Sequence, residues 1–263
     1  LTDEATIGNK KGKDWADETI EQLKSMPNVI VKNRSQVFGY YDHNMMVMLE
    51  RTKDHDPNAS EFTPRQRLWY IRAKEVIIST GSIERPLVFG NNDRPGVMLA
   101  SAAKEFMKVY GVLVGKKPII FTNNDTGYEA AIEFKNNGID PLVLDVRKNP
   151  EGPIIQEAKN LNIKVKFSYG VINAKGHLRV NEAIIGKLND DKSGYENIEH
   201  ISCDCICVSG NWTPTVHLSS QSGNKLKFNE KINAFVPNQS RQNENTIGSA
   251  KGTYSLRGSL EDG

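Results

Sequence analysis

The residues from Lys117 to about 171 alternate between short apolar runs and helix-forming stretches, and this alternation limits the possible folds more than any other feature. The five segments are KPIIF, TGYEAAIEFKNNG, DPLVLDVR, IIQEAKNLN and IKVKFSY. The first helix-forming stretch ends at Gly138, and glycine commonly terminates helices. A β-α-β-α-β order predicts parallel strands joined by right-handed crossovers, and hence an α/β fold.

The first turn of this unit, in IIFTNNDTGYEAA, lies where a dinucleotide-binding fold keeps its G-x-G-x-x-G loop. Thr122, Asn124 and Gly127 stand at the three glycine positions, so only the third is glycine. The Cβ of Asn124 is expected to keep a pyrophosphate away from the backbone, whereas Gly127 permits close contact between helix and strand. The sequence therefore predicts a dinucleotide fold that survives as a scaffold with an empty or altered pocket.

An acidic residue follows this turn at the spacing that such folds use. Asp145 ends the second strand 18 residues after Gly127, close to where a carboxylate takes the ribose hydroxyls of NAD. A carboxylate there would also repel the 2′-phosphate of NADP, although Arg147 lies nearby. The candidate cofactor-binding residues of this pocket are Thr122, Asn124, Asp125, Gly127 and Asp145.

The segments before residue 112 predict a helix, an antiparallel meander and a second helix. DWADETIEQLKSM has apolar residues near helical spacing, and VMLASAAKEFMKVYG is a helix stopped by Gly111. After the alternating region, HLRVNEAIIGKL and a cysteine-bearing run are expected to be strands. The meander strands are NVIVKN, SQVFGYYD, NMMVMLERT and RLWYIRA, followed by EVIISTG as a buried strand.

The charge pattern and the hydropathy argue against several partner classes. The 263 residues carry a formal net charge of +2, with Lys and Arg scattered among Asp and Glu, so no basic stripe favours nucleic acid. No apolar run approaches the roughly 20 residues that span a bilayer, and the N-terminus lacks the apolar core of a signal peptide. We therefore expect a cytoplasmic protein that binds neither nucleic acid nor membrane.

The three cysteines, at 203, 205 and 207, all fall in ISCDCICVSG. This spacing places them on the same face of one predicted strand, where they cannot easily ligate one metal. Zinc sites use C-x-x-C pairs on turns with a second pair elsewhere, and the sequence has none. We therefore expect no metal site, and reduced thiols that pack as small apolar groups.

Three short motifs resemble parts of flavoproteins with two dinucleotide-binding domains. ISTGSIERP resembles the A-T-G turn after the fourth strand of their FAD domain, and TIGSAKG resembles their late G-D-A motif. Val37 stands where such folds contact an adenine through the backbone. The order of these motifs is that of an NAD-like domain inserted into an FAD-like one. The resemblance implies that Val37, Thr80, Gly81, Gly248 and Ser249 bind a dinucleotide.

Longer stretches are similar to the alpha subunit of heterotetrameric sarcosine oxidase, from about residue 10 to 255. They are FGYYDHN, RLWYIRAKEVIISTGSIERPLVFGNNDRPGVMLASA, FTNNDTGYEAA, LDVR, CDCICVSGNWTPTVHL and NAFVP. The T-N-N-D turn is thus shared with this family. Related subunits of opine, proline and hydrogen cyanide forming dehydrogenases share the fold but fewer of these stretches.

The resemblance implies NAD, or FAD, in the FAD-like domain of the full-length subunit. For the complex it implies FMN or FAD at the beta subunit and a folate-binding region, neither held by this chain. The family's first Gly-rich fingerprint would precede residue 1 and its folate region would follow residue 263, so we expect a central fragment. Asn211 and Ser249 stand where Gly and Ala or Asp are usual.

We expect an incomplete FAD-like outer domain, residues 1–111 and 213–263, and an inserted NAD-like domain, residues 112–212. The first functional hypothesis is the dinucleotide-binding region of a sarcosine oxidase-like flavoprotein, which works with a beta subunit and further subunits. The alternatives are a non-catalytic scaffold that docks partner subunits, or a subunit of an opine or proline-type dehydrogenase. No residue is expected to be catalytic, and the isolated chain is expected to be inactive.

Overall fold

The computed structural model of the chain describes residues 6–263, which divide into two compact units. The chain passes from one unit to the other more than once. The first unit contains the described residues up to Ile78, with His217–Lys225 and Pro237–Asn245, and the second contains Ser79–Val216, Leu226–Val236 and Thr246–Gly263.

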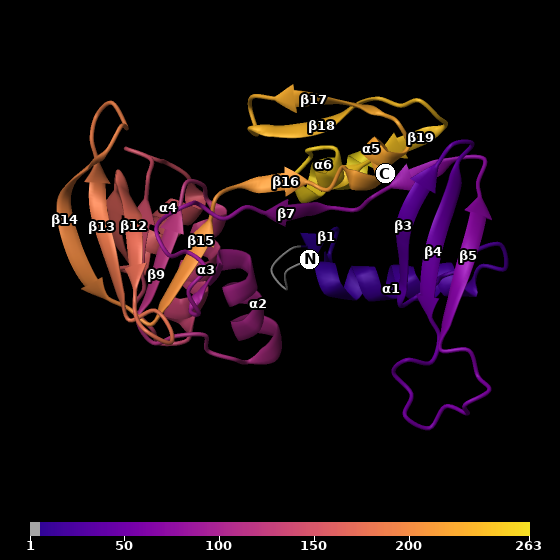
Figure 1. Cartoon of the computed structure of the whole chain (residues 1–263), viewed down its shortest axis with the longest axis horizontal. Helices are drawn as coiled ribbons and strands as arrows, with labels where there is room; N and C mark the ends of the chain where they lie inside the picture. The colour runs from indigo at the N-terminus through magenta and orange to yellow at the C-terminus, as the bar shows by residue number, and fades with distance from the viewer. Residues whose placement is uncertain (1–5) are drawn as a thin grey trace. The chain divides into compact units, whose positions relative to one another are not determined.

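A five-stranded parallel sheet forms the centre of the second unit (Figure 1). Its strand order is β11-β10-β9-β15-β8, and every neighbouring pair is parallel. The β-α-β-α-β order expected between residues 117 and 171 is therefore confirmed. The strands are β8 (Val97–Leu99), β9 (Pro118–Thr122), β10 (Leu142–Asp145), β11 (Lys164–Phe167) and β15 (Cys205–Ser209).

The sheet starts earlier in the sequence than expected, at β8. Residues 97–99 were expected to open a helix, but they pair with β15, and the helix α2 (Ala100–Tyr110) begins after them. Gly111 ends α2 in the left-handed conformation, with φ 64°, as its position predicts. The predicted outer domain (residues 1–111 plus 213–263) and inserted domain (residues 112–212) stay a prediction. The two compact units group residues that lie close together, and they do not show which segments fold as a domain.

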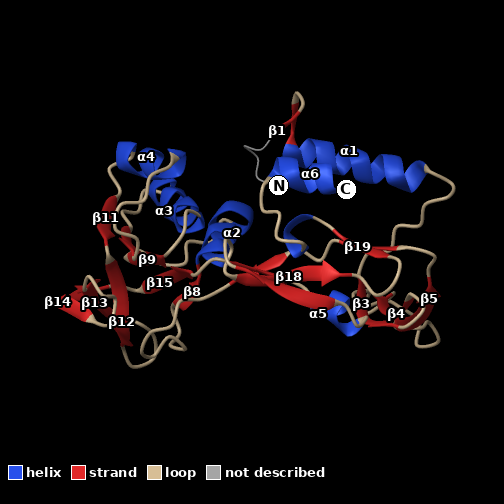
Figure 2. Cartoon of the chain, turned by 90° about the horizontal axis from the view of Figure 1, so that it is seen from above, coloured by secondary structure: helices blue, strands red, loops and turns tan. Residues whose placement is uncertain are grey.

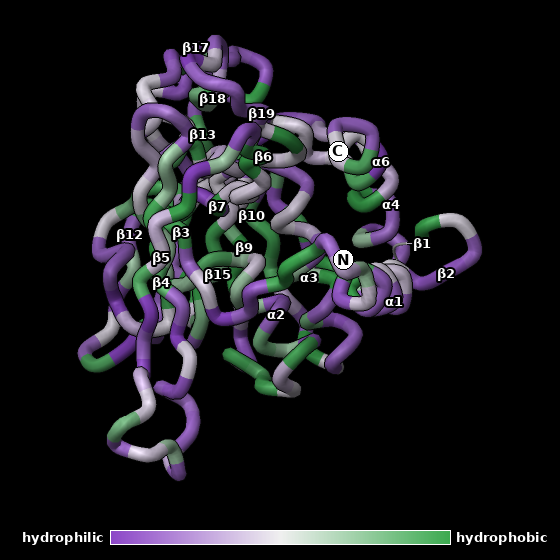
Figure 3. The backbone as a smooth tube through the Cα atoms, turned by 90° about the vertical axis from the view of Figure 1, so that its right-hand side faces the viewer, coloured by the Kyte–Doolittle hydropathy of each residue, from purple (hydrophilic) through white to green (hydrophobic). Residues whose placement is uncertain are grey.

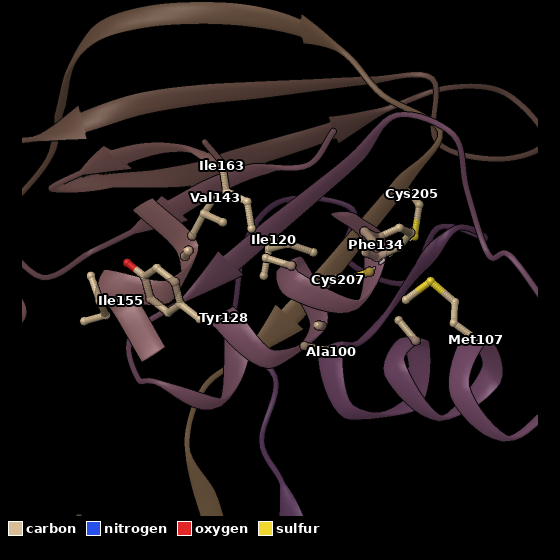
Figure 4. Packing of buried hydrophobic residues seen from close by; sticks show 14 residues of the cluster. Ala100, Met107, Ile120, Tyr128, Phe134, Val143, Ile155, Ile163, Cys205 and Cys207 are labelled. Atoms are coloured by element: carbon tan, nitrogen blue, oxygen red, sulfur yellow. Dashed lines mark hydrogen bonds between the residues drawn. The ribbon is translucent and has the colours of Figure 1, made fainter. Parts of the chain in front are cut away.

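Helices α2, α3 (Thr126–Asn136) and α4 (Pro153–Asn160) cover one face of the parallel sheet (Figure 2). Their apolar side chains pack with the strands in one buried cluster. Tyr128 and Phe134, both on α3, are fully buried in it beside Ile120 of β9 (Figure 4). The packing of α3 therefore fixes the turn that joins it to β9.

A three-stranded antiparallel sheet covers the opposite face (Figure 2). Its residues Val171 and Ile185 pack with Phe121 and Leu144 of the parallel sheet in a second buried cluster. Figure 3 shows hydrophobic residues concentrated in β9 and β15, which are covered on both sides. Only the middle strand was predicted. The strands are β12 (Tyr169–Lys175), β13 (Glu182–Leu188) and β14 (Tyr195–Ser202).

The cysteines occupy two different places. Cys205 and Cys207 lie on β15 with their Sγ atoms 3.4 Å apart, in the helix-facing cluster. Cys203 lies before β15 and packs in the cluster on the opposite face. The expectation that all three share one face of one strand is therefore wrong. The reason is a break at Asp204, whose carboxylate accepts a hydrogen bond from the backbone N–H of Lys117 (2.8 Å).

We expect the three thiols to be unreactive toward a soluble aromatic disulfide reagent in the folded chain and reactive after denaturation. All three are buried. Burial raises the pKa of the Cys203 thiol to about 12, and a hydrogen bond with Cys205 together with burial raises the pKa of Cys207 well above its usual range. The thiolate is the reactive form. Counting reacted thiols with and without guanidinium checks this, and rapid reaction in native buffer would contradict it.

The first unit is built on the antiparallel sheet β3-β4-β5, which confirms the predicted meander. NVIVKN, expected to be its first strand, forms no strand. Tyr40, Val76 and Ile78 form its buried cluster. Its elements are β1 (Thr6–Ile7), β2 (Lys10–Lys11), α1 (Gly12–Ser25), β3 (Ser35–Tyr41), β4 (Met45–Arg51), β5 (Gln66–Arg72), β6 (Val76–Ile78), α5 (His217–Gln221) and β19 (Glu244–Thr246).

Short elements complete the second unit, and β7 pairs with β16 in it. Among residues 6–263, no helix combines the length and the hydropathy needed to cross a membrane. The remaining elements are β7 (Ser82–Glu84), β16 (Trp212–Pro214), β17 (Lys225–Asn229), the 3-10 helix η1 (Gly248–Ala250), α6 (Leu256–Asp262) and β18 (Ala234–Gln239), which from Pro237 on belongs to the first unit.

Candidate functional site

A cavity of about 590 Å³ lies in the second unit, beyond the carboxyl ends of β9, β10 and β15. The carboxyl ends of parallel strands are where open α/β sheets bind their ligands. This cavity is therefore the candidate site. It is lined by Ser82, Asn123, Asn124, Asp125, Thr126, Glu129, Arg147, Asn211, Trp212, Ser249 and Tyr254.

The T-N-N-D turn is held together by its own side chains. The Oδ1 atom of Asn124 accepts the backbone N–H of Thr126 (2.9 Å), and its Nδ2 donates to the carbonyl oxygen (3.1 Å) and the hydroxyl (3.2 Å) of Ser209. Thr122 Oγ1 accepts the backbone N–H of Asn124 (3.1 Å). In a Gly-rich loop, N–H groups at the helix start face the pyrophosphate. Here the Thr126 N–H is already used, so the turn does not fit a pyrophosphate in the usual way.

Gly127, the second residue of α3, lies directly against the end of β9. A Cβ built on it would be 2.6 Å from both Cβ and Oγ1 of Thr122, which is closer than real side chains approach. Glycine at this position therefore keeps the start of α3 close to the sheet, as its counterpart does in dinucleotide-binding folds.

The carboxylate of Asp145, at the end of β10, is fully buried. Its Oδ2 accepts hydrogen bonds from the hydroxyl of Tyr128 (2.8 Å) and from Nη2 of Arg147 (2.8 Å). Its Oδ1 accepts from the backbone N–H (2.9 Å) and Nε (3.1 Å) of Arg147. Burial and the charge of Asp145 raise the pKa of Tyr128 above its ordinary value. A ribose hydroxyl would have to displace one of these donors to reach Asp145.

Arg147 connects this buried carboxylate to the cavity. Its Nη1 donates to Oδ1 of Asp125 (2.8 Å), and about 30% of its side chain is exposed. Burial lowers the pKa of Arg147, but hydrogen bonds to Asp145 and Asp125 outweigh this, and the pKa lies above its ordinary value. Of the five N–H donors of a guanidinium, the two aspartates engage three. Among the described residues that line the cavity, Arg147 alone is cationic.

The two motifs expected in the outer domain lie next to each other. Thr80 Oγ1 donates to the carbonyl oxygen of Thr215 (2.8 Å), which holds the turn that contains Gly81. Gly81 and Gly248 have φ values of 76° and 60°, in the left-handed region that favours glycine. A Cβ on Gly81 would lie 3.9 Å from Oγ of Ser249. These turns therefore expose backbone that a ligand can approach closely.

The structure brings some predicted residues together and separates others. Asn124, Asp125 and Ser249 line one cavity, whereas Val37 lies half-buried on β3, in the first unit. The sequence indicated Arg147 only as a neighbour of Asp145, and it did not place Trp212 or Tyr254 in the site. The sequence positions of two of these residues pointed to the site. Arg147 follows the second strand of the β-α-β unit, and Tyr254 closely follows TIGSAKG. No group of three or more potential metal ligands occurs in residues 6–263.

We expect Asn124→Gly to raise the affinity for NAD about tenfold, equivalent to about 1.4 kcal/mol. The substitution removes the Cβ and releases the Thr126 N–H for a phosphate oxygen. Calorimetric titration with NAD measures the change. The matched control is Asn123→Gly, because Asn123 belongs to the same turn and lines the cavity, but its side chain accepts a hydrogen bond from Nδ2 of Asn124 (2.9 Å) and does not engage the Thr126 N–H. Tight binding of NAD by the unmodified turn would contradict the prediction.

Comparison with known proteins gives one consistent group of relatives. No protein-family profile matches the chain. The chain is 35% identical over 263 residues to the sarcosine oxidase subunit alpha of Rhizobium meliloti (strain 1021), covering 100% of this chain and 26% of that protein. It is 31% identical over 260 residues to the same subunit of Corynebacterium sp. (strain P-1), covering 98% of this chain and 27% of that protein. The chain thus spans about a quarter of the length of these relatives, and the resemblance predicted from its motifs is confirmed.

Solved structures share the fold at low sequence identity. A bacillithiol disulfide reductase from Staphylococcus aureus has a TM-score of 0.67 at 14% identity, covering 100% of this chain and 78% of that one. An L-proline dehydrogenase from P. horikoshii has a TM-score of 0.61 at 20% identity, covering 95% of this chain and 42% of that one. The chain therefore shares the fold of these two oxidoreductases, which agrees with the fold class that the sequence predicted.

Proposed function

Because the chain resembles sarcosine oxidase alpha subunits along its whole length, we propose that it is the dinucleotide-binding region of such a subunit. The observation that carries this proposal is 35% identity extending over all 263 residues. The cavity at the carboxyl ends of the parallel strands supports it, because this is where folds of this class bind nucleotides.

The proposed reaction of the complete enzyme is the oxidative demethylation of sarcosine to glycine. Two electrons from sarcosine reduce oxygen to hydrogen peroxide. The oxidised methyl carbon is released by water as formaldehyde, or is transferred to tetrahydrofolate as methylene-tetrahydrofolate. This chain contributes cofactor binding and contacts to the beta subunit and further subunits, and none of its residues is assigned to the chemical step. Its location is proposed to be the cytoplasm.

The cofactor proposed for this region is NAD, or FAD, bound by backbone and hydroxyl groups of the outer domain. The proposed contacts in the second unit are Thr80, Gly81, Gly248 and Ser249, and Val37, in the first unit, is proposed as a contact on the resemblance alone. The conformations of Gly81 and Gly248 support the proposal, because a backbone without Cβ atoms admits a phosphate or ribose. FMN or FAD at the beta subunit and folate belong to the proposed complex and not to this chain.

The proposed domain division is residues 1–111 plus 213–263 for the outer domain and 112–212 for the inserted domain. Limited proteolysis tests it, because linkers between domains are cut before compact cores. The expected first cuts lie between residues 90 and 115 or between 210 and 225. First cuts inside residues 119–145 would contradict the division, because this segment carries β9, α3 and β10.

Mass spectrometry of small molecules released from the denatured parent complex tests the proposed function. The expected result is NAD, or FAD beyond the amount held at the beta subunit, in stoichiometric amount with the subunit that contains this chain. The matching activity assay follows peroxide formation with sarcosine as substrate. A complex that releases no dinucleotide and does not oxidise sarcosine would overturn the proposal.

A second candidate function is a scaffold that docks partner subunits without holding a dinucleotide. The bond from the Thr126 N–H to Asn124 favours this alternative for the inserted domain, because it occupies the donor that a pyrophosphate would use. Intact assembly of the parent complex with no released NAD, and with no FAD beyond that held at the beta subunit, is the result expected from the scaffold.

A further inference from the structure

We propose that the cavity recognises an adenine nucleotide by a 2′-phosphate bound to Arg147, so that the inserted domain selects NADP-type over NAD-type ligands. The inference rests on the proposed function, because it assumes that the cavity receives a nucleotide. The position of Asp145 alone predicts a preference for NAD, and the proposal reverses that preference.

The first step of the argument is the position of Arg147. In dinucleotide-binding folds, the residue at the end of the second strand meets the ribose 2′-position, and an arginine nearby accommodates a 2′-phosphate. Asp145 ends that strand here, but it is fully buried and accepts hydrogen bonds from Tyr128 and Arg147. Arg147, and not Asp145, is the residue of this pair that lines the cavity.

The second step is the geometry of the guanidinium. Asp145 holds it through two N–H groups, Nε and Nη2, which fixes its plane. Two of its five N–H donors have no partner among the described residues. A fixed guanidinium with free donors binds phosphate through charge-assisted hydrogen bonds, and little side-chain freedom is lost on binding.

The third step is the absence of a competing phosphate site at the turn. The Thr126 N–H bonds to Asn124, and the side chain of Asn124 also bonds to Ser209. A 5′-phosphate or pyrophosphate therefore gains little at the start of α3. The anion contact of this pocket is expected at Arg147 instead.

Two carboxylates line the cavity and oppose an anion. Glu129 is paired with Lys104, which offsets its charge. Asp125 bonds to Nη1 of Arg147, and its side chain is 49% exposed. A phosphate bound by the free donors meets the charge of Asp125 beside Nη1, and this half-exposed carboxylate can turn into water. Asp125 therefore weakens phosphate binding without blocking it.

The cavity also suits the rest of a nucleotide. Its volume of about 590 Å³ lies in the range of small-ligand pockets, roughly 300 to 1,000 Å³. Trp212 and Tyr254 provide aromatic surface for a base, and both belong to the lining. The hydroxyl of Tyr254 donates to the carbonyl oxygen of Trp212 (3.0 Å), which holds the two residues together.

Calorimetric titration of the 263-residue chain with 2′-AMP and 5′-AMP tests the proposal, because the isomers differ only in the position of the phosphate. We expect 2′-AMP to bind about 10- to 100-fold more tightly, the range for a hydrogen bond to a charged group. NADP should likewise bind more tightly than NAD. Arg147→Gln should remove both preferences.

Asp125→Asn is the second variant, and it does not disturb the buried pair. It removes the competing carboxylate and should tighten 2′-AMP binding severalfold, by a larger factor than it changes 5′-AMP binding. Arg147→Lys keeps the charge but not the planar fork and should retain only part of the preference. Circular dichroism confirms that each variant is folded.

Four results would overturn the inference. The first three are equal affinities for the two isomers, a preference that survives in Arg147→Gln, and an unchanged 2′-AMP affinity in Asp125→Asn. The fourth is binding of neither 2′-AMP nor NADP. The proposed function is judged separately, because NAD released from the parent complex would support that function even when this cavity binds nothing.

Discussion

Asp145→Ala should lower the free energy of unfolding by about 3 kcal/mol, because it leaves one half of a buried ion pair without its partner. Asp145 is fully buried, and its carboxylate accepts hydrogen bonds from Tyr128 and Arg147. Without it, the Tyr128 hydroxyl loses its acceptor and the guanidinium loses the charge that offsets its partial burial. Urea unfolding followed by circular dichroism measures the loss.

Asp125→Ala is the matched control for this prediction. Asp125 bonds to the same guanidinium at the same distance of 2.8 Å, but its side chain is 49% exposed. Exposed ion pairs contribute about 0 to 1 kcal/mol, so this variant should unfold at nearly the wild-type urea concentration. Equal losses of unfolding free energy in the two variants would show that the burial of Asp145 does not make its ion pair with Arg147 more stabilising than the exposed pair.

Phe134→Ala should lower the free energy of unfolding by about 3 to 5 kcal/mol, the range for truncating a buried aromatic side chain. Phe134 is fully buried between α3 and the parallel sheet (Figure 4). The cavity left behind would loosen α3, and with it the turn that precedes this helix. The same urea titration measures the effect.

The control for Phe134 is Phe62→Ala, which removes the same atoms from an exposed position. Phe62 is 86% exposed, so its truncation should change the free energy of unfolding by no more than about 0.5 kcal/mol. A loss below about 1 kcal/mol in Phe134→Ala would mean that the neighbouring side chains close the cavity.

Most of the parallel sheet and its helices could be predicted because their signals are local. The β-α-β-α-β segment carries an apolar run for each strand and a helical pattern for each helix. Gly111 and Gly138 both adopt positive φ near the ends of the helices that they were predicted to terminate. Glycine is the residue that most readily adopts positive φ, so a glycine at a helix end can be recognised in the sequence without knowledge of what surrounds it in the fold.

The antiparallel strands were harder to predict because their stability comes from neighbours. NVIVKN has a strand-like composition but forms no strand, and its Ile30 is 83% exposed. In contrast, β14 contains three acidic or histidine side chains and still pairs along β13. The propensity of a residue for strands depends on what it packs against, which a short pattern does not contain.

The candidate site was only partly predictable for a related reason. The spacing between Gly127 and Asp145 correctly located the end of the second strand. Which groups bond to the Asp145 carboxylate depends on which donors the fold brings close to it. In the structure these donors are Tyr128 and Arg147. The sequence shows which groups are present, whereas their pairing depends on geometry within a few tenths of an ångström.

The strand order of the parallel sheet has a consequence for self-association. Its two edges are β8, which has only three residues, and β11, which has the sequence KVKF with Lys164 exposed. Short edge strands and edge lysines discourage pairing with the edge of another molecule. The apolar inner strands β9 and β15 are each paired on both sides, so their backbone is closed to an intruding chain. A sheet with such a hydrophobic centre is thereby protected against growth into a fibre.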